Sequence, residues 1–459
     1  MKVIQLIKTG YLKLVFILVI ISTTWVNFNH TFWQNEDVIT HDVKHYYSYL
    51  PAFFYEKDLK LNFLNDSVNQ KIELNYYNPN KAPNSNYIIK MSMGMAISYL
   101  PFFTAAHFYC KLFNVTTNGF TSPYHFALQF STLIYFLIGL FYLWKVLVKF
   151  YNKTISTITL LIICFATNVF FYLTFKAALS HIVGFTLIAL FLYLTIGWYQ
   201  KQNLKYSIAL GCVIGFLTLV RPINVLVVIF FVLYNVKNKN DLQVNLKLYW
   251  TQKLHVAIIV LFSFLVVLPQ LIYWKYITNQ YFFNSYVGEN FYFFNPHIFK
   301  AIFGFRKGWL IYTPVMVFSL IGILFIYKQY KQFYLAIVIF LIIYIYITFS
   351  WWCWWYGGSF SQRVMIDIYP ILAIPLSAFL KYISQLSNKK IIAFSTLIIF
   401  LTLLNLFQTT QAKFNIIHYD SMTFKSYVKA FGVITNNDDI KKLYQPANYP
   451  KALKGEDEN

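Results

Sequence analysis

The chain has 459 residues, of which 58% are hydrophobic and only 12% are charged, and its formal net charge is +22. Long apolar runs recur along its length, which excludes a string of soluble domains and indicates an all-α polytopic membrane protein. The Lys and Arg residues lie between the apolar runs instead of on one soluble face. They therefore argue against nucleic-acid binding and for topology signals and phosphate-bearing ligands.

The first apolar run, residues 10–28, follows three lysines, Lys2, Lys8 and Lys13. No small-residue cleavage site follows this run, which ends in STTWVNFNH. A removable signal peptide is therefore disfavoured. We expect an uncleaved signal-anchor helix whose N-terminus lies on the inner side of the membrane.

The segment from Trp33 to Phe63 gathers charged and titratable side chains directly after this helix. Its sequence, WQNEDVITHDVKHYYSYLPAFFYEKDLKLNF, places Asp42 next to His41 and close to His45. Charged groups are costly at membrane depth and usually serve a function there. We predict that Asp42 is a catalytic carboxylate on the outer face and that His45 is structural.

Residues 91–113, MSMGMAISYLPFFTAAHFYCKLF, are long enough to span a bilayer, but Pro101 and His107 interrupt them. A spanning helix here would invert every later connection against its lysines. We expect a membrane-surface or partly inserted helix pair instead, within a first outer region of residues 29–124. The alternative, a spanning helix, would separate Asp42 from the cations of the later loops.

Ten further apolar runs bring the expected number of transmembrane helices to about eleven. The expected transmembrane domain covers residues 1–408, and residues 409–459 form a short outer tail. Two of the runs meet at Arg221 and Pro222, so a single kinked segment is an alternative there. The ten runs are residues 125–148, 154–175, 179–198, 206–220, 222–236, 254–274, 309–327, 333–350, 366–383 and 391–408.

The lysines agree with this arrangement. With the N-terminus inside, every expected inner connection is basic, as the positive-inside rule requires. The short outer connections hold one cation each, at Lys176, Arg221 and Arg363, and the long connection 275–308 is a partial exception. The inner cations are Lys145, Lys149, Lys153, Lys201, Lys205, Lys237, Lys239, Lys247, Lys253, Lys328, Lys331, Lys381, Lys389 and Lys390.

Polar residues beside the apolar runs mostly fall at the outer boundary. We therefore predict one polar cavity that opens outward at the level of the lipid headgroups. Arg221 lies at a helix end and either contacts substrate or snorkels and binds backbone carbonyls. Glu289 and His297 either bind substrate or fix an outer loop. The outward polar residues are Asp42, Lys90, His181, Arg221, Glu289, His297, Arg306, Arg363, Asp367, His418 and Asp420.

Two later segments, FGFRKGWLIYTP and SWWCWWYGGSFSQRVMIDIYP, bring Arg306 and Arg363 to this face. Two guanidinium groups near headgroup depth suit bidentate phosphate binding. The tryptophans are either interfacial anchors or stacking surfaces for sugars and polyprenyl chains. Asp367, four residues after Arg363, has the helical spacing of an ion pair that orients Arg363.

The order of these parts carries a family resemblance. A signal anchor is followed by a long outer loop with an early acidic residue (THDVKHYYSYLPAFF), a membrane-surface segment with a lysine (IIKMSMGMAISYLPFF) and then many helices. This layout resembles the GT-C glycosyltransferases, most of all the bacterial group akin to protein mannosyltransferases and the lipid A aminoarabinose transferase. The segments FRKGWLIYTP and WWYGGSFSQR look like those of uncharacterised bacterial members.

The resemblance implies a multi-pass enzyme of the bacterial cytoplasmic (inner) membrane. Such an enzyme moves a sugar, with inversion, from a polyprenyl-phosphate carrier to a lipid, glycan or protein acceptor on the outer face. Asp42 corresponds by position to the family's general base or acceptor-positioning acid. The expected substrate-binding residues are His41, Lys90, His181, Arg221, Arg306 and Arg363.

One position departs from the family pattern and leaves the cofactor question open. Family members often carry a second acidic residue where this chain has Ser180 and His181. No metal-ligand set is evident, so the choice between no cofactor and a divalent metal stays open. A membrane transporter or a flippase for lipid-linked glycans is the alternative function, but transporters place ionisable groups near the bilayer midplane, often in repeated halves.

Overall fold

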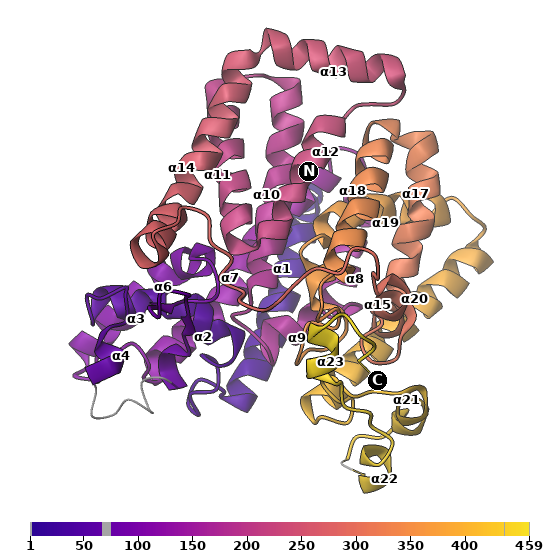
Figure 1. Ribbon diagram of the computed structural model, residues 1–459. Helices are drawn as coiled ribbons and strands as arrows, with labels where there is room; N and C mark the ends of the chain where they lie inside the picture. The colour runs from indigo at the N-terminus through magenta and orange to yellow at the C-terminus, as the bar shows by residue number, and fades with distance from the viewer. Residues whose placement is uncertain (1, 67–74, 436, 459) are drawn as a thin grey trace.

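The computed structural model describes residues 2–66, 75–435 and 437–458, and helices make up most of it (Figure 1). Within these ranges one short antiparallel hairpin, β1 (Asn80–Lys81) and β2 (Tyr87–Ile88), is the only sheet. The expectation of a mostly helical protein with apolar, membrane-type helices is confirmed.

Six helices of the described residues are long and apolar enough to cross a bilayer. Each of the eleven predicted runs overlaps either one of these six or one of five shorter apolar segments. The six are α1 (Lys2–His30, of which Gly10–His30 qualifies), α7 (Ser122–Leu147), α10 (Ser180–Gln200), α14 (Lys253–Thr278), α18 (Lys331–Phe349) and α20 (Asn388–Lys413). The shorter segments are α8 (Lys153–Phe165), α11 (Leu204–Val220), η1 (Pro222–Leu226) with α12 (Val227–Leu233), η2 (Pro314–Met316) with α17 (Val317–Gln329), and α19 (Tyr369–Ile383).

The predicted first outer region contains several short elements and one long helix. The prediction of a helix pair at residues 91–113 is wrong, because α6 (Gly94–Leu112) is one continuous helix with Pro101 inside it. This helix packs beside α7 and α11. The short elements are α2 (Asp42–Tyr47), α3 (Tyr49–Phe54) and α4 (Phe63–Asp66).

The predicted run 154–175 is broken into α8 and α9 (Val169–Thr174). Asn168 lies at the break, and its side chain accepts a hydrogen bond from the Tyr369 hydroxyl at 2.9 Å. The same side chain donates to the carbonyl of Gln362 at 3.3 Å. The helix is therefore interrupted at Asn168, and the Asn168 side chain contacts the loop that leads to Arg363.

The two ends of the helical body differ (Figure 1). At one end lies α13 (Lys239–Thr251), a helix that the apolar runs did not predict, begun by a capping box of Asn238 and Asp241. The first outer region and the tail lie at the other end. The remaining helical elements are α15 (Ile298–Phe303), α16 (Trp309–Tyr312), η3 (Arg363–Ile366), α21 (Phe424–Ala430), α22 (Asp438–Lys441) and α23 (Tyr449–Leu453).

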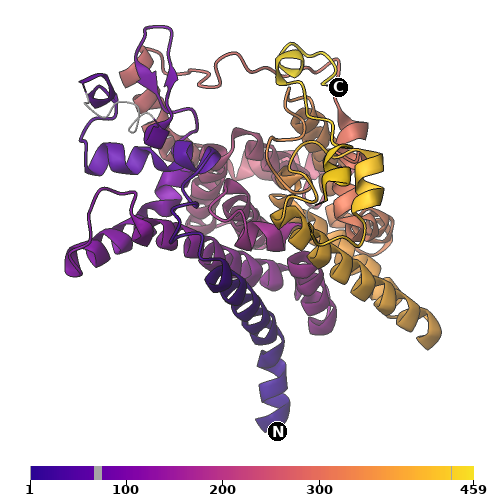
Figure 2. The same cartoon turned by 90° about the horizontal axis from the view of Figure 1, so that it is seen from below.

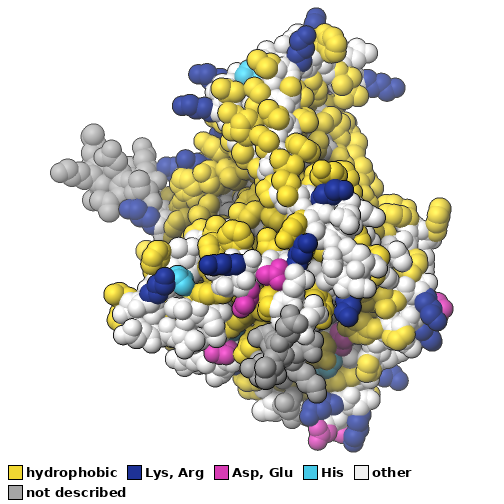
Figure 3. Space-filling view, turned by 60° about the vertical axis from the view of Figure 1, so that its left-hand side comes forward, with side chains coloured by type: hydrophobic (Ala, Val, Ile, Leu, Met, Phe, Trp, Pro, Cys, Tyr) yellow, Lys and Arg dark blue, Asp and Glu magenta, His cyan; other side chains and the backbone are white. Residues whose placement is uncertain are grey.

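Apolar and acidic side chains are distributed over the surface as expected of a membrane protein. The N-terminal part of α1 projects away from the other helices (Figure 2), and α1, α14 and α20 expose large apolar side chains such as Trp25, Val260 and Ile392. In the view of Figure 3, hydrophobic side chains cover the upper part, and the visible Asp and Glu side chains lie in the lower part. Acidic groups thus gather at the end that carries the first outer region.

Candidate functional site

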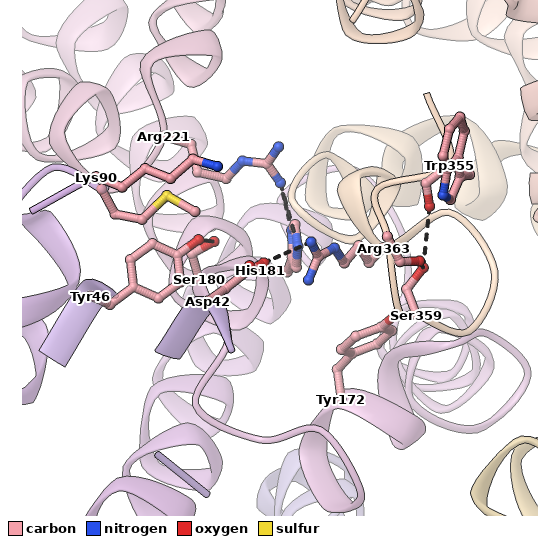
Figure 4. Close-up of polar contacts among 12 residues, drawn as sticks. Asp42, Tyr46, Lys90, Tyr172, Ser180, His181, Arg221, Trp355, Ser359 and Arg363 are labelled. Atoms are coloured by element: carbon pink, nitrogen blue, oxygen red, sulfur yellow. Dashed lines mark hydrogen bonds and ion pairs between the residues drawn. The ribbon is translucent and has the colours of Figure 1, made fainter. Parts of the chain in front are cut away.

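Asp42 and Arg363 meet at the outer-region end of the protein although 321 positions separate them in the chain. The Arg363 Nη2 donates to Asp42 Oδ2 at 2.7 Å. The Asp42 side chain is 30% exposed and that of Arg363 is 13% exposed. Figure 4 shows the two side chains pointing toward each other. The predicted catalytic carboxylate is therefore partly accessible and paired with one of the predicted cations.

The backbone on the Asp42 side is constrained. Asp42 begins α2, and His41 before it adopts φ 48°, an uncommon value for a residue other than glycine. His41 itself is exposed, and the buried residues of the short helix are Val43, His45, Tyr46 and Tyr47. The turn thus points Asp42 toward the bundle while the rest of α2 anchors it.

The loop between α18 and η3 positions Arg363. Tyr356, Gly357 and Ser361 have positive φ in this loop, which therefore turns sharply before η3. The Tyr172 hydroxyl bridges the Phe360 backbone, donating to its carbonyl at 3.1 Å and accepting from its N–H at 3.0 Å. The paired glycines of the sequence thus belong to a fixed turn that delivers the guanidinium of Arg363.

The Asp42 carboxyl is ionised at neutral pH in this arrangement. Burial raises the pKa of Asp42, but the charge and hydrogen bond of Arg363, with smaller contributions from His45 and Lys90, together hold the pKa below its ordinary value of 3.8. Burial also lowers the pKa of His45 to about 4, so that imidazole is neutral at pH 7. Asp42 therefore faces cations in the form of Arg363 and Lys90, and not a charged histidine.

A second cluster centres on Asp367, whose side chain is fully buried. His181 Nδ1 lies 2.8 Å from Asp367 Oδ1, and Asn224 Nδ2 donates to Oδ2 at 3.0 Å. Arg221 Nη1 lies 3.8 Å from Oδ2 and 2.8 Å from His181 Nδ1. The prediction that Asp367 pairs with Arg363 is wrong, because η3 turns the two side chains to different partners.

Gly184 in α10 makes room for this cluster. A β-carbon at Gly184 would lie 2.9 Å from Cγ of Asp367, closer than real side chains approach. The glycine thus allows the Asp367 carboxylate to lie against α10, one turn from His181.

A third pair joins Lys90 to Glu289, which form an ion pair with side chains that are 22% and 15% exposed. Trp352 Nε1 donates to the other Glu289 oxygen at 2.9 Å. Backbone hydrogen bonds tie the two loops together, with Trp352 N–H donating to the Asn290 carbonyl at 3.1 Å. Glu289 therefore pairs with a cation of the polar cluster and also receives a hydrogen bond from the neighbouring loop.

Tyr46 connects α2 to the second cluster. It lies one helical turn after Asp42, and its hydroxyl is 3.1 Å from the Ser180 hydroxyl. Ser180 precedes His181 at the start of α10. The three pairs are therefore neighbours, as Figure 4 shows for Asp42, Lys90, Arg221 and Arg363.

Arg306 is turned to the tail. It donates to the backbone carbonyls of Asp420 and Gln445, and its guanidinium lies 6.0 Å from the centre of the Trp355 ring. Lys307 is buried and donates to the carbonyl of Ser359. These cations fix the tail and the turn before Arg363, and Arg306 does not join the other predicted substrate-binding residues through any of these contacts.

The tail is held by its own polar cluster. Burial raises the pKa of Asp420, but hydrogen bonds from His418, Ser421 and Tyr449 outweigh burial and lower the pKa to about 2. The Tyr449 hydroxyl donates to Asp420 at 3.0 Å, and its ring packs edge-on against Trp355. Two of the four tryptophans in the loop, Trp354 and Trp355, are fully buried and act as packing residues.

The structure thus brings together five of the seven predicted site residues: Asp42, Lys90, His181, Arg221 and Arg363. His41 adjoins them on the exposed side of α2, and Arg306 lies with the tail. Sequence reasoning missed Asn224 and Tyr46, which carry neutral side chains without a distinctive spacing. It named Ser180 only as a departure from the family pattern, and it treated Trp352 as an anchor or stacking surface instead of a hydrogen-bond donor to Glu289. Within the described residues, no group of three or more His, Cys, Asp or Glu is arranged to hold a metal ion.

Comparison with known proteins assigns no family. No protein-family model matches the chain, and no curated protein matches it.

Proposed function

We propose that this chain is an integral-membrane glycosyltransferase that moves a sugar from a polyprenyl-phosphate carrier to a lipid, glycan or protein acceptor. One observation carries the proposal: Asp42, a partly exposed carboxylate, pairs with Arg363 and neighbours Lys90 and Arg221 at one end of a set of apolar helices. A base beside several cations suits transfer from a phosphate leaving group. The GT-C-like layout of the sequence agrees with this chemistry.

The orientation belongs to the same proposal. We infer that all eleven apolar segments cross the bacterial cytoplasmic membrane, with the N-terminus inside and the site facing outward. The Lys-rich connections support this orientation through the positive-inside rule. The position of α13 supports it too, since this helix carries Lys239 and Lys247 at the end opposite the site.

An apolar groove beside the site suits the carrier's hydrocarbon chain. The groove has a volume of about 230 Å³ and is lined by residues of α3 and α6, among them Phe53, Phe54 and Ile97. Tyr49 also lines it and donates to the carbonyl of Met91 at 2.8 Å, next to Lys90. We propose that the polyprenyl chain lies in this groove, which Tyr49 connects to the segment that carries Lys90.

The proposed reaction uses these positions. Asp42 accepts the proton of an acceptor hydroxyl or amine as that group attacks the anomeric carbon. The bond from the anomeric carbon to the acceptor forms, and the bond to the phosphate oxygen breaks. The electron pair leaves with the polyprenyl phosphate, whose charge Lys90, Arg221 and Arg363 stabilise. Attack from the face opposite the leaving group inverts the anomeric centre.

The test is sugar transfer by the purified full-length chain in lipid. Wild type supplied with radiolabelled polyprenyl-phosphate sugars should move the label to an acceptor or to water. Asp42→Asn should lose about 100-fold or more of this rate, the usual worth of a general base, while keeping its melting temperature. Asp37→Asn, an exposed neighbour, is the matched control and should keep the rate. Lipid-linked sugar that crosses the bilayer without transfer would favour the flippase.

A further inference from the structure

The cations of the site are already neutralised by the protein itself. Lys90 pairs with Glu289, Arg221 lies against Asp367, and Arg363 pairs with Asp42. An anionic ligand that enters this site must therefore compete with a carboxylate for at least one cation. The cost of that competition depends on how firmly each carboxylate is held.

The three carboxylates differ in this respect. Asp367 is fully buried and is held by His181 and Asn224 as well as by Arg221. Glu289 is 15% exposed and is held by both Lys90 and Trp352.

Asp42 is the most weakly held of the three. Its side chain is 30% exposed, and among the described residues Arg363 alone donates a side-chain hydrogen bond to it. It also follows His41, whose positive φ is strained in a residue other than glycine. Asp42 is therefore the carboxylate that can leave its cation at the lowest cost.

Arg363 has unused capacity for an anion. It binds Asp42 end-on through Nη2, and its buried Nε has no hydrogen-bond partner among the described residues. A buried donor without a partner is costly, and a guanidinium can bind two phosphate oxygens in parallel. The geometry at Arg363 therefore favours a bidentate oxyanion over the present single contact.

We propose that Asp42 occupies the anion-binding position of Arg363 in the free protein and that the phosphate of the lipid carrier displaces it. This inference rests on the proposed function, because it takes the ligand to be a phosphate-bearing lipid. Displacement removes the counter-charge of Asp42 and places an anion beside it, while Lys90 and His45 still face it. Both changes raise the proton affinity of the carboxylate, so carrier binding converts a weak base into a stronger one.

The experiment measures binding without transfer. The full chain, in nanodiscs of zwitterionic phosphatidylcholine, is titrated with a sugar-free polyprenyl phosphate. Asp42→Asn should bind it about tenfold more tightly than wild type, because the internal competitor is gone and a hydrogen bond to a charged group is worth about that much. The gain should vanish when Arg363→Gln is added. Polyprenol, which lacks the phosphate, should bind both proteins equally.

Asp37→Asn is the control for overall charge. It makes the same change of one unit near the site without touching Arg363, and it should shift the affinity by less than about twofold. If Asp42→Asn unfolds, Asp42→Ser in the same titration replaces it. Equal or weaker binding by the folded variant, a gain that survives Arg363→Gln, or no binding by any protein would overturn the displacement. If Asp42→Asn shows the gain but wild type never transfers sugar, the proposed function alone would be refuted.

Discussion

Asp367 lies against Arg221, with 3.8 Å between Oδ2 and Nη1, although Arg363 precedes it by only four residues. This choice of partner divides the site into a buried part around Asp367, whose two oxygens both have polar partners, and an accessible part around Asp42. In the displacement proposed above, the first part supports the site and the second exchanges partners. The two carboxylates should therefore respond differently to the same substitution.

Asp367→Asn is predicted to destabilise the protein. The change leaves Arg221 without its buried counter-charge, and breaking such a pair costs about 3–5 kcal/mol. Thermal unfolding in detergent, followed by intrinsic fluorescence, should show a clear fall in melting temperature. Asp438→Asn removes an exposed carboxylate that pairs with Lys441 and should leave the melting temperature unchanged. Equal behaviour of the two variants would contradict the supporting role of Asp367.

Gly184→Ala is predicted to disturb the same carboxylate from the opposite side. The added methyl group would lie 2.9 Å from Asp367 Cγ, and such overpacking costs about 1–3 kcal/mol. We expect a lower melting temperature and, if the proposed function is right, slower sugar transfer. Gly10→Ala in α1 is the control, because a β-carbon there meets nothing within 4 Å. A Gly184→Ala protein as stable as wild type would show that Asp367 can move freely.

The tail is predicted to loosen in acid. The pKa of Asp420 is lowered from its ordinary value of 3.8 to about 2. Ionised Asp420 therefore stabilises the folded tail fully at pH values above 3.8. This stabilisation is lost as the pH falls from about 4 toward 2. Hydrogen–deuterium exchange, corrected for intrinsic rates, should speed up over residues 440–455 between pH 5 and pH 3. In Asp420→Asn the exchange should be fast at both pH values, and a wild-type tail that stays protected at pH 3 would contradict this.

The orientation can be tested by labelling single cysteines in intact cells. Thr116 in the first outer region and Lys247 on α13 are both exposed. We expect an impermeant maleimide to label Thr116→Cys from outside and Lys247→Cys only after the membrane is opened. The native cysteines give a low background, since three are buried and Cys212 is half-buried. The reverse pattern would invert the proposed topology.

Apolar length was the feature of the sequence that predicted structure best. Each of the eleven apolar runs overlaps an apolar helix, because burial or lipid exposure of such runs leaves the backbone few alternatives to a helix. The same patterning could not foresee α13, whose sequence KNDLQVNLKLYWT mixes polar and apolar residues. Nor could it foresee the break at Asn168, whose side chain donates a hydrogen bond to the loop before Arg363.

The sequence predicted which residues lie in the candidate site better than it predicted which of them pair with each other. The expected order and orientation of the helices were enough to place Asp42, Lys90, Arg221 and Arg363 on one face. Choosing partners required loop geometry: η3 turns Asp367 away from Arg363, and the tail captures Arg306 through backbone carbonyls. The spacing of charged residues cannot predict contacts to backbone carbonyls or to neutral side chains such as Asn224.

The 321 positions between Asp42 and Arg363 also set an order of events during synthesis. At about 5–20 residues per second, Asp42 leaves the ribosome roughly 15–65 s before its partner. During that interval the carboxylate has water and lipid headgroups around it, and most of the helices insert before the pair can close. The site is therefore among the last parts of the protein to be completed, and a nascent chain that stops before Arg363 carries the acid without the cation that holds it.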